Sequence, residues 1–201
     1  MFEIKNIDVV STSQISALRG VPDMPSGLYV AGNVDVLENT CISVAGSRKI
    51  DSHSSQWLRD LIKQTDDVTY VSGLALGADA VAHRAALASG QPTVAVLPSG
   101  FNNIAPKQHK ALAHQIVLSG GCLISEYEPN QGATRSSYVK RNRIIAALGK
   151  HLIVPQCDKQ SGTMHTVRFA NDYDKLIITQ VANYSGNKYI IDSGEFKRIL
   201  L

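Results

Sequence analysis

The sequence predicts an α/β fold in which a doubly wound, mostly parallel sheet carries helices on both faces. From residue 40 onward, short apolar runs alternate with helical segments, which is the pattern of repeated β-α units. The runs are apolar almost throughout, as strands covered on both faces require. The first two runs lead into turns of small residues that precede helices, a feature of Rossmann-like sheets.

Residues 1–39 precede this alternation and differ from it. The segment 6–19 is predicted to form one short helix, 21–27 a turn-rich link and 28–33 a short strand. This is too little chain for a second hydrophobic core. We therefore expect 1–39 to be a short N-terminal extension that packs on a main domain at 40–201.

The first half of the main domain is predicted to alternate strands with two helices. The first helix is amphipathic, because the apolar residues 57, 58, 61 and 62 fall on one of its faces. The second helix can be capped by the carboxylate of Asp79 and ends at Gly90. The predicted ranges are strand 41–45, helix 52–64, strand 68–71, helix 79–89 and strand 93–97.

The second half continues the alternation. A helix opens with Pro106 and is ended by Gly120 and Gly121. A loop over 126–134 is rich in Glu, Pro, Asn and Gly. The remaining predicted ranges are helix 106–119, strand 122–125, helix 136–149, strand 151–154, helix 162–171 and strand 176–179.

The bulk composition is that of an ordinary globular protein. The chain has 201 residues, 44% of them hydrophobic, and a net charge of +3, which is too weakly basic to establish a nucleic-acid partner. Cys41, Cys122 and Cys157 form no CxxC pair, so we expect small buried residues in a reducing compartment. No apolar run approaches the ~18 residues that span a bilayer. The first residues carry Glu3 and Lys5 and do not resemble a secretion signal. We expect a cytoplasmic protein without membrane contact.

Two turns of small residues predict an anion-binding edge. Gly46-Ser47-Arg48 follows the strand 41–45, and the turn 72–79 follows the strand 68–71. Such turns bring backbone N–H groups and a helix N-terminus to one edge of a parallel sheet, and Arg48 adds a positive charge. The alternative is that small residues only allow close packing of helix on strand. Neither turn matches the dinucleotide fingerprint or the Walker A loop, so no standard nucleotide cofactor is expected.

The helix predicted at 136–149 supplies a second positive charge. Arg141 falls on the same inward face as Ile144 and Ile145. A buried guanidinium needs an anionic partner, either in an internal salt bridge, with Glu126 or Asp79, or in a bound phosphate. Lys140 and Arg143 point elsewhere on the helix. Tyr138 is either core filler or a platform for a base, and the turn 161–163 is a third candidate anion seat.

Groups that could catalyse a reaction are scarce. There is no HExxH motif and no cysteine–histidine spacing typical of a metal site. His83 lies four residues after Asp79, and we interpret this pair as a simple hydrogen bond within a helix rather than as an acid–base dyad. We therefore predict a binding protein, not an enzyme, without metal or cofactor.

These motifs together resemble the DprA (Smf) family of bacterial DNA-processing proteins. The resemblance covers nearly the whole chain. The segments that carry it are Gly46-Ser47-Arg48, SGLALGADAVAHRAAL at 72–87, TVAVLPSGF at 93–101, ISEYEP at 124–129, RNRIIAAL at 141–148 and SGT at 161–163.

The resemblance implies an extended Rossmann fold that binds single-stranded DNA, assists loading of the RecA recombinase and forms a homodimer. Tyr138-Val139 stand where the family usually has Phe-Pro, and Pro155-Gln156 where it tends to have an acidic residue. The chain also has no room for the helical and winged-helix domains that often flank the family's core. The predicted nucleic-acid-binding residues are Gly46, Ser47, Arg48, Ser72, Gly73, Gly77, Tyr138, Lys140, Arg141, Asn142, Arg143, Ser161, Gly162 and Thr163.

Two other functions are compatible with a phosphate-binding sheet edge. One is a nucleoside-monophosphate phosphoribohydrolase of the Lonely-Guy type, although residues 160–166 lack the catalytic glutamate of that pattern. The other is a sensor that binds a nucleotide without turning it over.

Overall fold

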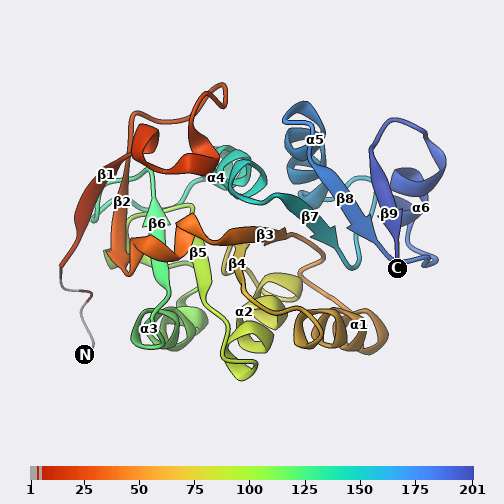
Figure 1. Ribbon diagram of the computed structural model, residues 1–201, viewed down its shortest axis with the longest axis horizontal. Coiled ribbons are helices and arrows are strands. Elements are labelled where there is room, and N and C mark those ends of the chain that lie inside the picture. Colours follow the sequence, from red (N-terminus) through yellow and green to blue (C-terminus); the bar gives the residue numbers. More distant parts are fainter. Residues whose placement is uncertain (1–3, 5) are drawn as a thin grey trace.

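The computed structural model describes residue 4 and residues 6–201. Within these residues, nine strands form one mixed sheet with the order β1-β2-β6-β5-β4-β3-β7-β8-β9 (Figure 1). The strands are β1 (Asp8–Ser11), β2 (Gly27–Gly32), β3 (Thr40–Val44), β4 (Val68–Ser72), β5 (Thr93–Leu97), β6 (Cys122–Ser125), β7 (His151–Val154), β8 (Leu176–Thr179) and β9 (Arg198–Leu200). The α-helices are α1 (Ser52–Lys63), α2 (Ala78–Ala88), α3 (Lys110–Leu118), α4 (Arg135–Leu148), α5 (Thr163–Asp172) and α6 (Ser185–Asp192).

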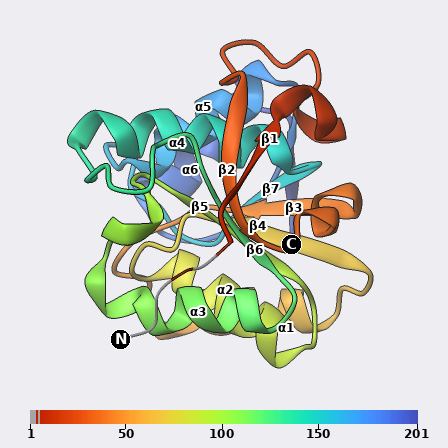
Figure 2. The ribbon, with the colours of Figure 1, turned by 90° about the vertical axis from the view of Figure 1, so that its left-hand side faces the viewer.

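The strands from β3 to β9 confirm the predicted parallel sheet. The pairs β3–β4, β4–β5, β5–β6, β3–β7, β7–β8 and β8–β9 are all parallel. Helices α1, α2 and α3 cover one face of the sheet, and α4 and α5 cover the other (Figure 2). Strands β4, β5 and β6 are buried along their whole length, which explains their unbroken apolar sequences.

The order in which the chain adds parallel strands to the sheet reverses at β3. The chain runs outward from β3 through β4, β5 and β6, and then returns to place β7 on the other side of β3. The crossover helices on the two sides of this point lie on opposite faces of the sheet, which leaves a crevice beyond the carboxyl ends of the strands. The fold therefore positions the turn after β3 beside the start of α5.

The N-terminal residues differ from their prediction. The helix predicted at 6–19 is wrong, because the chain forms β1 and then two short 3-10 turns at 12–14 and 16–18. The strand predicted at 28–33 is confirmed as β2, which pairs antiparallel with both β1 and β6. Ile15 and Leu18 still pack in the core. The spacing of apolar residues that suggested an α-helix is therefore also compatible with short 3-10 turns. The proposed boundary between residues 39 and 40 stays a prediction.

Two further parts of the chain differ from the prediction. The chain at 107–109 is a 3-10 turn that leads into α3, so the regular helix begins after the predicted Pro106. Helix α6 and strand β9 were not predicted at all. They pack on the far edge of the sheet, where Ile190 and Phe196 join a cluster with Leu152 and Val154.

Candidate anion-binding site

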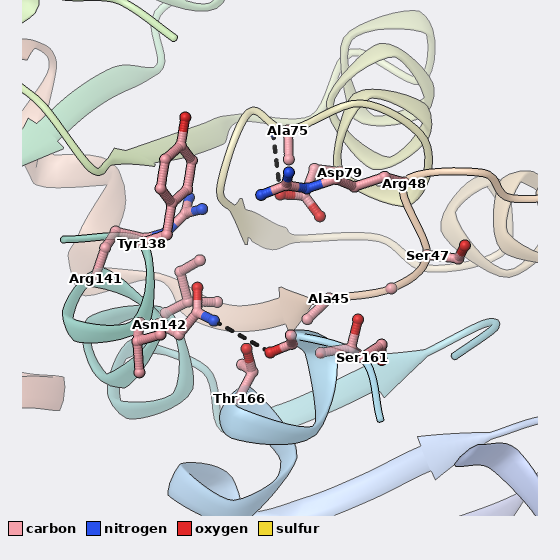
Figure 3. A pocket seen from close by; sticks show the side chains of 15 residues that line it. Ala45, Ser47, Arg48, Ala75, Asp79, Tyr138, Arg141, Asn142, Ser161 and Thr166 are labelled. Carbon is pink, nitrogen blue, oxygen red and sulfur yellow. Dashed lines mark hydrogen bonds between the residues drawn. The ribbon is translucent and has the colours of Figure 1, made fainter. Parts of the chain in front are cut away.

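A pocket of ≈ 450 Å³ opens beyond the carboxyl end of β3, where the strand order reverses. In Figure 3, Tyr138 and Arg141 come from α4, Arg48 from the turn after β3, Asp79 from the first turn of α2, Ser161 from the turn before α5 and Thr166 from α5. The lining residues are Ala45, Gly46, Ser47, Arg48, Ala75, Asp79, Tyr138, Val139, Arg141, Asn142, Ile145, Ser161, Gly162, Thr163 and Thr166. Segments far apart in the sequence thus meet at one place.

The two small-residue turns pack directly on each other. The Ala78 N–H donates to the Ser47 carbonyl over 3.0 Å, and the Ser47 N–H donates to the carbonyl of Gln156 over 2.7 Å. A Cβ on Gly46 would lie 2.6 Å from the Ala78 side chain. Close packing therefore accounts for part of this glycine pattern, while Arg48 remains exposed at the pocket.

Arg141 is the buried cation of the pocket. Its side chain lines the pocket although the residue is only 4% exposed, and its Nη1 donates to the Val96 carbonyl over 2.6 Å. Its Nε is buried and has no partner among the described residues. Burial lowers the pKa of this guanidinium, and the nearby Asp79 carboxylate opposes that effect. The inward orientation predicted from helix periodicity is confirmed.

The salt bridge considered for Arg141 is not formed among the described residues. Glu126 instead pairs with Arg143, whose Nη1 lies 2.6 Å from a carboxylate oxygen of Glu126. Arg143 also donates to the carbonyl of Asp23 over 2.6 Å. Arg143 thus ties the N-terminal segment to α4, and it does not line the pocket.

Asp79 plays a different part from the predicted one. It does not cap α2, because Gly77 is the N-cap residue there and has a φ of 74°. The Asp79 carboxylate accepts hydrogen bonds from the N–H groups of Gly73 and Ala75, at 3.1 and 3.2 Å, and so closes the turn between β4 and α2. Burial raises its pKa, although Arg141 and these hydrogen bonds act in the opposite direction.

The predicted hydrogen bond between His83 and Asp79 is also wrong. The Nδ1 of His83 lies 2.8 Å from the hydroxyl of Thr93, which itself donates to the Tyr70 carbonyl. Because that hydroxyl proton is already used, Nδ1 of His83 carries the proton donated to Thr93. Burial is the main cause that lowers the pKa of His83 to about 3.

Aromatic and polar groups complete the rim. The Arg48 guanidinium lies over the Tyr138 ring, 5.3 Å from its centroid. The Ser161 hydroxyl is buried without a partner in the described part of the chain, directly before the N-terminus of α5. The first N–H groups of a helix have no partner within it, so this end of α5 favours an anion.

The structure brings most of the predicted site residues together. Those that do not line the pocket are Ser72, Gly73, Gly77, Lys140 and Arg143. Gly73 nevertheless supports it, since a Cβ there would overlap the Arg141 guanidinium. Ser72 donates to the Val44 carbonyl, and Lys140 is exposed to solvent.

The predicted site omitted six of the lining residues, which are Ala45, Ala75, Asp79, Val139, Ile145 and Thr166. Thr166 lies one helical turn after Thr163 on α5, and that spacing was the available signal. Within residues 4 and 6–201, no cluster of His, Cys, Asp or Glu could hold a metal ion, and no helix is long and apolar enough to cross a membrane. All three cysteines are buried and free, as predicted.

Fold and site together define a Rossmann-like protein with a pocket lined by two arginines at its topological switch point. The chain belongs to the DNA recombination-mediator protein A family, whose model matches residues 9–194. Protein Smf of Escherichia coli K12 is 36% identical over 155 residues, which are 76% of this chain and 41% of that protein. The chain thus spans less than half the length of that curated relative.

Two solved structures of the same family share the fold. DNA processing protein A (DprA) from Streptococcus pneumoniae is 28% identical with a TM-score of 0.87, over 98% of this chain and 72% of that one. DNA processing protein A from Helicobacter pylori is 27% identical with a TM-score of 0.83, over 92% of this chain and 86% of that one. The structural description of the Helicobacter protein concerns a unique mode of single-stranded DNA binding.

Proposed function

We propose that this chain binds single-stranded DNA, with a backbone phosphate held in the pocket between Arg48 and Arg141. The observation that carries the proposal is Arg141, a buried guanidinium that lines an open pocket without a direct ion pair among the described residues. A buried cation that makes no direct ion pair leaves its charge available to an anionic ligand at the pocket. Family membership and the single-stranded DNA binding of the Helicobacter relative support DNA as the source of that anion.

The rim fits a nucleic acid better than a free phosphate ion. The Tyr138 ring stands beside Arg48 at the mouth of the pocket, where a base adjoining the bound phosphate can stack. The N-terminus of α5 and the Ser161 hydroxyl offer further donors. The pocket is open to the surface, as passage of a continuous strand requires.

Fluorescence anisotropy with an unstructured oligonucleotide over a series of salt concentrations tests this proposal. Binding should weaken steeply as salt rises, because phosphate neutralisation releases counterions. The double variant Arg48→Ala/Arg141→Ala should lose most of the affinity. The matched control Arg59→Ala/Arg84→Ala removes the same charge from exposed positions of α1 and α2 that do not line the pocket, and should bind much as the natural chain does.

The outcomes separate specific from diffuse binding. Equal binding by the pocket and control variants would show that general charge, not the pocket, holds DNA. Absence of binding at low salt would overturn the proposal altogether. Because Arg141→Ala also removes a buried hydrogen bond, thermal melting checks folding, and the single Arg48→Ala variant tests the pocket at an exposed residue.

The same proposal extends to the cellular role by family resemblance. We expect a cytoplasmic homodimer that assists loading of RecA on single-stranded DNA. Light scattering at several concentrations tests the dimer. RecA-dependent ATP hydrolysis on DNA precoated with single-strand-binding protein tests the loading role, and no increase on adding this chain would contradict it.

The absence of a catalytic centre stays a prediction. Asp79 brings a carboxylate to the pocket, and this carboxylate accepts hydrogen bonds from the backbone N–H groups of Gly73 and Ala75 in its own turn. Incubation with AMP tests the alternative of a phosphoribohydrolase, for which release of free adenine is the expected product. Calorimetry with mononucleotides tests the alternative of a sensor.

A further inference from the structure

The pocket contains two positive charges and one negative charge, and these side chains differ in how deeply they are buried. Among its lining residues in the described chain, the charged ones are Arg48, Arg141 and Asp79. Arg48 is exposed, whereas Arg141 and Asp79 are 4% and 7% exposed. A pocket proposed to bind a phosphate thus contains a buried carboxylate, which would repel that phosphate. This carboxylate needs an explanation.

Gly73 lies against both buried charges. Its N–H donates to the Asp79 carboxylate over 3.1 Å, and the site of its missing Cβ is filled by the Arg141 guanidinium. Asp79 and Arg141 therefore share one neighbour without forming a direct ion pair among the described residues. Each still acts on the other through space, because Asp79 raises the pKa of Arg141 and Arg141 lowers that of Asp79 against the effect of burial.

A hydrogen-bond role alone does not require a carboxylate. The backbone N–H groups of Gly73 and Ala75 both donate to the same oxygen of Asp79, Oδ2. The amide oxygen of an asparagine could accept the same two N–H groups. What asparagine could not supply is the negative charge that balances a buried guanidinium.

We propose that Asp79 is a positioning residue that serves as the internal counter-charge of Arg141, stabilising the empty pocket and weakening its hold on a DNA phosphate. The inference rests on the proposed function for the phosphate and deepens it. In the free protein Asp79 offsets the cost of the buried cation. A bound phosphate also balances the charge of Arg141, but it lies close to the Asp79 carboxylate, which repels it. Binding is therefore weaker than it would be with the two arginines and no carboxylate.

Asparagine and alanine at position 79 separate the charge from the hydrogen bonds. Asp79→Asn keeps an acceptor for the turn and removes the charge, so it should bind a single-stranded oligonucleotide about tenfold more tightly while unfolding more easily. Asp79→Ala also removes the acceptor, so the turn loosens and binding should be weaker than in Asp79→Asn. Anisotropy in mildly alkaline buffer provides the comparison, because burial raises the pKa of Asp79 and a higher pH favours its ionised form.

A stability cycle tests the counter-charge without any DNA. In the natural chain, Asp79→Asn should lower the midpoint of urea unfolding. In an Arg141→Gln background the carboxylate is itself an unbalanced buried charge, so Asp79→Asn should raise the midpoint. If Asp79→Asn alone does not fold, the pair Arg141→Gln and Arg141→Gln/Asp79→Asn still gives the decisive sign.

The outcomes distinguish this inference from the proposed function. If the natural chain binds no DNA, the proposed function fails, while the stability cycle still tests the counter-charge. If the natural chain binds and folded Asp79→Asn binds equally or more weakly, the repulsion is refuted. If Asp79→Asn lowers the midpoint equally in both backgrounds, Asp79 acts only through its hydrogen bonds and the counter-charge is refuted.

Discussion

Replacement of Gly73 by alanine is the sharpest test of how the fold holds Arg141. Gly73 does not line the pocket, yet a Cβ on it would lie 2.6 Å from Nη2 of Arg141 and would overlap Nη1 and Cζ outright. Its φ is not positive, so an alanine backbone is acceptable there. The added methyl group therefore acts through the guanidinium.

The structure sets the size of the effect. Non-bonded carbon and nitrogen atoms need about 3.5 Å, so the guanidinium must retreat by about 1 Å or more. The 2.6 Å hydrogen bond from Nη1 to the Val96 carbonyl cannot survive that movement with good geometry. A hydrogen bond from a charged donor contributes about 1.5–3 kcal/mol, and Gly→Ala regains about 0.4–1 kcal/mol through the unfolded chain. We expect Gly73→Ala to be less stable by about 1–2 kcal/mol.

DNA affinity should fall further than stability. A guanidinium displaced from its seat loses its charge-assisted contact with the phosphate, which corresponds to about 10- to 100-fold in affinity. Urea unfolding and anisotropy on the same preparation measure the two effects. Gly132→Ala is the control, since nothing lies within 4 Å of a Cβ there. Natural affinity and stability in Gly73→Ala would refute the argument that Gly73 seats Arg141.

Three further predictions concern single side chains. Tyr138→Ala should weaken oligonucleotide binding by about 1–3 kcal/mol while Tyr138→Phe binds normally, as measured by anisotropy; equal losses would mean that the hydroxyl, not ring stacking, matters. Arg143→Gln should lower the free energy of unfolding by about 3 kcal/mol, because it leaves Glu126 largely buried and unpaired, without lowering the DNA affinity of the folded fraction. His83 should weaken the fold in acid, because its pKa is about 3 in the folded protein against an ordinary 6.5. The unfolded chain therefore binds more protons, and the free energy of unfolding falls as pH drops from about 6.5 toward 3. The loss should be about 2 kcal/mol at pH 5. In His83→Asn, which keeps a donor for Thr93, the loss between pH 7 and pH 5 in urea unfolding should be smaller by that amount, and an unchanged loss would exclude His83 as its source.

The sheet could be predicted from sequence wherever burial decides the pattern. Strands β4, β5 and β6 are covered on both faces, so their sequences are apolar at every position and cannot be confused with surface segments. At the edges this signal fails. Strand β1 has exposed and half-buried residues only, and its pairing with β2 depends on tertiary context that a local pattern does not carry.

The orientation of Arg141 toward the pocket was predictable because it follows from helix geometry. Arg141 lies on the buried face of α4 by periodicity alone, and the structure confirms this orientation. The partner of each arginine was not predictable. Arg141 and Arg143 are two residues apart in the sequence. Only the fold shows that Glu126 pairs with Arg143, while Arg141 lines the pocket.

Asp79 shows why the electrostatics of such a site cannot be obtained from sequence spacing. Its position near the start of α2 suggested a helix cap, but Gly77 begins the helix and turns the carboxylate back toward Gly73. The Asp79 carboxylate therefore accepts from the same glycine against which the Arg141 guanidinium packs. The two charges, far apart in the sequence, thus act on each other. The affinity of the pocket for a phosphate therefore depends on the path of a short turn. A glycine that lies outside the pocket controls both the cation and its counter-charge.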